Sequence, residues 1–80
     1  MISTMTPMER RALAARVAIN SWLDCGPICK SVQEYFYDEG QVATNEELNC
    51  ALDAVRAYRA CTGDVSAETV AQHCAESPEA

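Results

Sequence analysis

The side chains whose types could do chemistry are five cysteines and one histidine, His73. The cysteines are Cys25, Cys29, Cys50, Cys61 and Cys74. Thiolates and imidazoles bind zinc, and a thiolate beside a histidine can act as a nucleophile. No two of these cysteines form the C-x2-C pair typical of zinc sites, and the nearest pair, Cys25 and Cys29, spans Gly26-Pro27, which interrupts a helix.

The spacing of the remaining groups disfavours both a zinc site and catalysis. His73 and Cys74 could complete a zinc site with Cys25 and Cys29, but neighbouring residues on a helix point about 100° apart. Glu46 and Glu47 likewise point in different directions, and there is no Gly-rich phosphate loop. The odd number of cysteines differs from the even sets of secreted disulfide scaffolds. We expect reduced, mostly buried thiols, no metal, no cofactor and no catalytic residue, and hence a protein that is not an enzyme.

One helix-start signal occurs twice in the chain. Thr6-Pro7-Met8-Glu9 and Thr44-Asn45-Glu46-Glu47 each place a threonine three residues before a glutamate, the pattern of a capping box. They predict one helix from Pro7 to about Cys25, ended by Gly26, and another from Thr44 to about Thr62. The boxes are 38 residues apart, a spacing that also suits a weak internal repeat.

Glycine, proline and serine delimit two further helices. One spans Pro27–Glu39 and stops at Gly40, and a short one is capped by Ser66 and closed by Ser77-Pro78. No stretch alternates as a strand does. The sequence therefore predicts an all-α fold, a compact bundle of four short helices that could be two packed helical hairpins. We expect a single helical domain over residues 1–80, with frayed ends at 1–6 and 77–80.

Helical periodicity assigns aromatic and small side chains to the core or to the surface. Trp22 completes the apolar face of the first helix and is assigned to the core. Tyr35 and Phe36 fall on the buried face of the second helix, whereas Tyr37 projects about 180° from Ile28, towards solvent. The third helix carries a second apolar stripe, which is either a core seam or the seam of a homodimer. The stripe consists of Cys50, Ala54, Ala57 and Cys61.

The charge balance narrows the function classes. The 80 residues carry 12 acidic and 6 basic side chains, a formal net charge of −6. This balance disfavours binding to nucleic-acid phosphates or to anionic membranes, since both need a basic face. No apolar run approaches the roughly 18 residues of a membrane span, and residues 1–11 lack the hydrophobic segment of a signal peptide. We expect a cytoplasmic protein that contacts neither nucleic acid nor membrane directly.

The acidic side chains are concentrated in the second part of the chain, where residues 34–80 hold ten acids against two bases. An exposed tyrosine surrounded by carboxylates is typical of a binding hot spot for a basic partner. Acids also favour helix starts and keep small proteins soluble, so a purely structural role is an alternative. The predicted partner-binding residues are Glu34, Tyr37, Asp38, Glu39, Glu46 and Glu47.

In size and composition the chain resembles small inhibitors from phages and mobile elements, including the anti-CRISPR proteins. The resemblance concerns general character and no diagnostic motif, so it transfers no residue roles. It implies a small acidic protein that binds a host defence or regulatory complex. Such a protein would occlude a basic surface of its partner, one that otherwise holds nucleic acid.

A second resemblance supports an alternative. Residues 51–76 are similar to the first two helices of winged-helix repressors: a long helix, a Thr-Gly turn and a short capped helix. This implies a transcriptional regulator derived from a helix-turn-helix protein, or its antagonist. The recognition helix and wing of those repressors have no counterpart after Ser77-Pro78, so we expect no direct DNA contact. The basic side chains outside this segment are Arg10, Arg11, Arg16 and Lys30.

Overall fold

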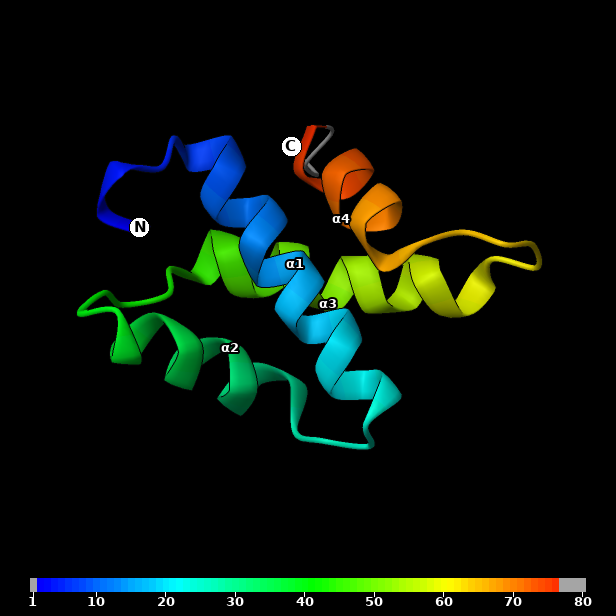
Figure 1. Ribbon diagram of the computed structural model, residues 1–80, viewed down its shortest axis with the longest axis horizontal. Helices are drawn as coiled ribbons and strands as arrows, with labels where there is room; N and C mark the ends of the chain where they lie inside the picture. The colour runs from blue at the N-terminus through cyan, green and yellow to red at the C-terminus, as the bar shows by residue number, and fades with distance from the viewer. Residues whose placement is uncertain (1, 77–80) are drawn as a thin grey trace.

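The computed structural model describes residues 2–76 of the chain. In this part the chain forms one turn of 3-10 helix, Ile2–Thr4, and four α-helices, with no strand (Figure 1). The all-α fold is therefore confirmed, and each helix begins and ends within about two residues of its prediction. The α-helices are α1 (Pro7–Leu23), α2 (Ile28–Asp38), α3 (Asn45–Ala60) and α4 (Ala67–Glu76).

The helices α1 and α3 cross at the centre of the molecule, with α2 on one side of α1 and α4 on the other (Figure 1). α1 contacts all three other helices, and the consecutive pairs α1–α2 and α3–α4 each pack together. This is the arrangement of two packed helical hairpins. An origin of the two hairpins by internal duplication stays a prediction.

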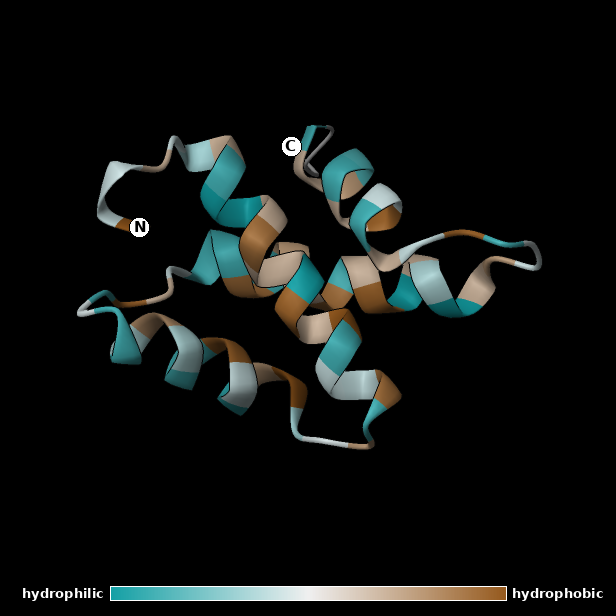
Figure 2. Cartoon of the chain, viewed as in Figure 1, coloured by the Kyte–Doolittle hydropathy of each residue, from teal (hydrophilic) through white to brown (hydrophobic). Residues whose placement is uncertain are grey.

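Small side chains let α1 and α3 approach closely where they cross. Ala14, Ala15 and Ala18 of α1 are fully buried. Figure 2 shows hydrophobic residues concentrated along the middle of α1, where it passes α3. From α2, Val32 and Phe36 are fully buried and close the core on that side. The core is thus a crossing of alanine-rich helices that is closed by the apolar face of α2.

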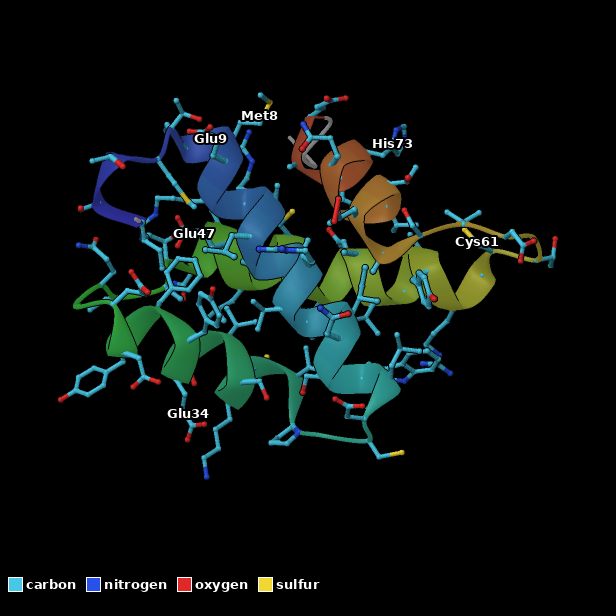
Figure 3. The ribbon with its side chains drawn as sticks, viewed as in Figure 1. Met8, Glu9, Glu34, Glu47, Cys61 and His73 are labelled. Atoms are coloured by element: carbon cyan, nitrogen blue, oxygen red, sulfur yellow. The ribbon has the colours of Figure 1, made fainter. Side chains whose placement is uncertain are left out.

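The cysteine stripe of α3 belongs to the core only at its first half. Cys50 and Ala54 are buried within this chain, Ala57 is half-buried, and Cys61 is exposed. Cys61 follows the last turn of α3 and is exposed (Figure 3). The first half of the stripe is therefore a core seam, and a homodimer through the stripe stays a prediction.

Residues before α1 pack on the core, and the expected fraying of residues 1–6 stays a prediction. Ile2 is only 2% exposed and Met5 packs against the core. The first helix signal in the sequence is at Thr6. Nothing local to Ile2 indicates that its side chain is buried in the core. The predicted fraying of residues 77–80 lies outside the described residues.

The turn between α1 and α2 differs from its prediction, because Cys25 rather than Gly26 adopts the left-handed conformation, with φ of 59°. Gly26 N–H donates to the Ser21 carbonyl (2.7 Å) and Cys25 N–H to the Trp22 carbonyl (3.0 Å), which completes a Schellman motif. Gly26 instead permits a close approach, since a Cβ there would lie 2.8 Å from Ser21 Oγ. Ser21 Oγ in turn lies 2.8 Å from Ser31 Oγ, and this hydrogen bond joins α1 to α2.

Trp22 lies at the edge of the core, half-buried. Its ring meets Tyr58 edge to face, with 6.2 Å between the ring centroids. The guanidinium of Arg59 lies 5.7 Å from the Trp22 ring centroid. Trp22 therefore packs on the core, as predicted, while the guanidinium of Arg59 lies over its ring.

Candidate protein-binding surface

The outward side of α2 carries the exposed tyrosine that the helical period predicts. Val32 and Phe36 are four residues apart and anchor one side of α2 in the core, which directs Tyr37 to the opposite side. Tyr37 is 77% exposed, as predicted. Glu34 points away from the bundle on the same helix (Figure 3). We define the α2 face as the exposed residues Glu34, Tyr37, Asp38 and Glu39.

Two further apolar side chains in this region are exposed, beyond the prediction. Tyr35 was expected in the core but is 43% exposed, because the core contact of α2 is made mainly by Val32 and Phe36, with Ile28 at its margin. Val42, in the α2–α3 connection, is 79% exposed and was not predicted. The only sequence signal that could have indicated an exposed Val42 was its position as an apolar residue outside the predicted helices. Together they add apolar area beside the acidic side chains.

The carboxylates of the α2 face are little used within the chain. Glu34 lies 4.0 Å from Lys30 Nζ, and both side chains are about two-thirds exposed, at 65% and 70%. Such an exposed pair contributes at most about 0.5 kcal/mol. Among residues 2–76, Asp38 and Glu39 make no ion pair. Their charge is therefore directed to solvent or to a partner.

Glu46 and Glu47, both predicted to bind the partner, have different environments. The Glu46 side chain is 69% exposed and lies 3.5 Å from Arg11 Nη1. Glu47 is only 4% exposed, and its Oε2 accepts a hydrogen bond from Arg10 Nε at 2.6 Å (Figure 3). The prediction that Glu47 is exposed is wrong, because Arg10 of α1, 37 positions away in the sequence, covers it. Glu47 is therefore not part of the exposed surface of the protein.

Arg10 holds the α2–α3 connection in place. Its Nη1 donates to Gln41 Oε1 at 3.0 Å, and its Nη2 donates to the Val42 carbonyl at 3.0 Å and to Glu47 Oε1 at 3.2 Å. The guanidinium also lies 5.2 Å from the centroid of the Phe36 ring. The position of the α2 face therefore depends on Arg10.

The Arg10–Glu47 pair shifts the titration of both groups. Burial opposes the charged form of Glu47, but hydrogen bonds from Arg10 and from the Thr44 backbone, with the Arg10 charge, outweigh it and lower the pKa of Glu47. The hydrogen bond to Glu47 raises the pKa of Arg10 in spite of burial. Both groups are thus held in their charged forms.

The cysteines differ from the prediction of mostly buried thiols. All five are free, but only Cys50 is buried, whereas Cys25 and Cys61 are exposed. Burial raises the pKa of the Cys50 thiol to about 11 and also raises that of Cys74, which disfavours a reactive thiolate at either position. His73 is exposed on α4. Within residues 2–76, no three His, Cys, Asp or Glu side chains are arranged to hold a metal ion.

Comparison with known proteins adds no family to this description. The chain matches no protein-family model, no curated protein and no solved structure. None of the helices in the described part of the chain has both the length and the apolar character needed to cross a membrane.

Proposed function

We propose that this protein binds a basic surface of a partner protein through the α2 face and thereby blocks access to that surface. The observation that carries the proposal is Tyr37, which is 77% exposed beside Glu34, Asp38 and Glu39, the last two without an ion pair in the described part of the chain. A tyrosine gives a large, rigid contact area, and surrounding carboxylates speed the encounter with a basic partner and fix its orientation. Val42 lies in the connection that follows α2, whereas Glu46 pairs with Arg11, whose guanidinium also binds the end of α4, and is not counted in the α2 face.

Direct binding to nucleic acid has less support. Arg10 is engaged with Glu47, and Arg11 Nη2 donates to the Ala75 carbonyl at 2.9 Å. Two of the four basic side chains in the first part of the chain are therefore used within the fold. A partner that itself holds nucleic acid fits both the acidic charge and the resemblance to small phage-borne inhibitors.

The test begins with capture of the partner from nuclease-treated lysate under reducing conditions, followed by titration of the purified partner at low and high salt. Tyr37→Ala should raise Kd by about 30-fold or more, the effect of losing a hot spot of about 2 kcal/mol. The double variant Asp38→Lys/Glu39→Lys should also weaken binding, and the loss of affinity should be larger at low salt than at high salt.

A matched control separates the surface from the overall charge. Asp24→Lys/Asp64→Lys changes the net charge equally, at exposed positions outside α2. Equal loss of affinity in both double variants would show that only net charge matters and would remove the α2 face as the site. A salt-sensitive, sequence-selective gel shift with DNA would favour the regulator instead.

A further inference from the structure

A groove of about 760 Å³ lies between α1 and α4, on the side of α1 away from α2. Its floor is apolar: Leu13 is 5% exposed, Ala71 is 2% exposed, and Met5 is half-buried. Glu9 of α1 and His73 of α4 lie on its two sides (Figure 3). None of the residues predicted to bind a partner lines this groove.

Carboxylates outnumber guanidinium groups along the walls of the groove. Glu68, Gln72 and Glu76 line it from α4 at intervals of four residues, so they form a row on one side of the helix with a step of about 6 Å. Gln72 Nε2 donates to Glu76 Oε2 at 2.9 Å, which confirms that neighbours in the row meet. On α1, Glu9 and Arg16 line the groove two turns apart.

The two helices that form the groove are joined by hydrogen bonds at the end of α4. Arg11 donates from Nε and Nη2 to the Ala75 carbonyl at 3.2 and 2.9 Å, which ties the end of α4 to α1. A ligand would therefore meet a preformed site. The groove is open to solvent rather than enclosed, which suits a helix whose outer side stays in solvent better than a small molecule that must be enclosed.

We propose that the α1–α4 groove binds an amphipathic basic helix of a partner protein. The apolar side of that helix packs over Met5, Leu13 and Ala71, and its lysines or arginines face the row of Glu68 and Glu76. Three carboxylates against one guanidinium give the charge complementarity, and Glu68 and Glu76, about 12 Å apart along α4, match basic residues at i and i+8 on the bound helix. This site is separate from the α2 face and does not depend on it.

The test uses a fluorescein-labelled 15-residue peptide with leucines at helical i, i+3, i+4 and i+7 spacing and lysines on both sides of them. Its binding to the full chain is measured by fluorescence anisotropy and mapped by amide chemical shifts. We expect salt-sensitive binding with shifts confined to α1 and α4. A scrambled peptide of the same composition that binds equally well, or shifts centred on α2, would overturn the proposal.

Matched variants locate the charges. Glu68→Gln/Glu76→Gln should weaken peptide binding roughly three- to tenfold, as expected for two partly exposed charge pairs. Glu34→Gln/Glu39→Gln removes the same net charge from the α2 face and should change binding less than about twofold. Equal effects of the two double variants would contradict a groove site.

A third variant fills the groove. Ala12→Arg places a long side chain on its lining and should reduce peptide binding more than tenfold. If Ala12→Arg lowers the thermal midpoint, Gln72→Arg gives the same block from an exposed position. Peptide binding that survives both variants would rule out the groove. Self-association of the chain that Gln72→Arg abolishes would replace the partner helix by a second copy.

Discussion

The two capping boxes have the same local geometry in different surroundings. Thr6 N–H donates to Glu9 Oε1 at 2.8 Å and Glu9 N–H to Thr6 Oγ1 at 3.1 Å. The corresponding distances between Thr44 and Glu47 are 2.9 and 3.1 Å. The first box is exposed, whereas Glu47 is buried and paired with Arg10.

This comparison shows that a local motif determines hydrogen bonds but not their energetic weight. An exposed cap contributes about 1 kcal/mol. A carboxylate that is removed from water needs its cation, because leaving one member of a buried pair alone costs several kcal/mol. The same four-residue pattern thus only starts a helix at Thr6, whereas at Thr44 it also connects α3 to α1 and α2 through Arg10.

The largest expected effect is that of removing the cation. Arg10→Ala leaves the Glu47 carboxylate buried without its partner and releases Gln41 and Val42, so we expect a loss of about 3 kcal/mol in the free energy of unfolding. Urea titration at pH 7 measures it. Arg16→Ala, at an exposed position of the same helix, should change stability by less than about 0.5 kcal/mol. A loss below about 1 kcal/mol in Arg10→Ala would contradict the structural role of Arg10.

The same substitution in both boxes tests the difference directly. Glutamine keeps the capping hydrogen bonds but carries no charge. Glu47→Gln should lose about 2 kcal/mol of unfolding free energy, and Glu9→Gln less than about 0.5 kcal/mol. Similar losses in both variants, measured by urea unfolding, would mean that the surroundings of the boxes do not matter.

Lower pH should weaken the second box selectively. The pKa of Glu47 is lower in the folded protein than its ordinary value. Its contribution is therefore complete above the unfolded pKa of about 4.3 and is lost as the pH falls through the folded pKa. The stability difference between the natural chain and Glu47→Gln should be constant from pH 7 to 6 and shrink below about pH 4.3. A stability difference that grows as the pH falls would contradict a lowered pKa of Glu47 in the folded protein.

The smallest effect concerns two helix ends with the same motif. Gly40 follows α2 with φ of 75°, and Gln41 N–H donates to the Phe36 carbonyl at 2.9 Å, as at the end of α1. Cys25 holds the equivalent position with a side chain that disfavours it. Cys25→Gly should stabilise by about 0.5–1 kcal/mol, and Gly40→Ala should destabilise by about 1 kcal/mol. Thermal unfolding that shows a loss in Cys25→Gly would contradict the strain at this turn.

Predictability along the chain follows the range of the interactions involved. The four helices and the exposure of Tyr37 could be predicted because caps, glycine stops and helical period act over three to seven residues. The exposure of Tyr35 could not be predicted. Its side chain lies at the margin of the apolar face of α2, and its burial depends on how closely α2 packs against α1 and α3. The groove was missed for a similar reason, because its walls are formed by residues about 60 positions apart, such as Glu9 and Glu68.

The sequence by itself determined where each helix starts, the acidic character of residues 34–80 and the outward direction of Tyr37, because these are properties of single segments. Only the tertiary structure decided that Glu47 lies in the interior, that Ile2 packs on the core and that Cys25 and Cys61 face solvent. The physical reason is that burial is set by which distant segment covers a side chain. Arg10 and Glu47 are 37 residues apart, and no local signal joins them.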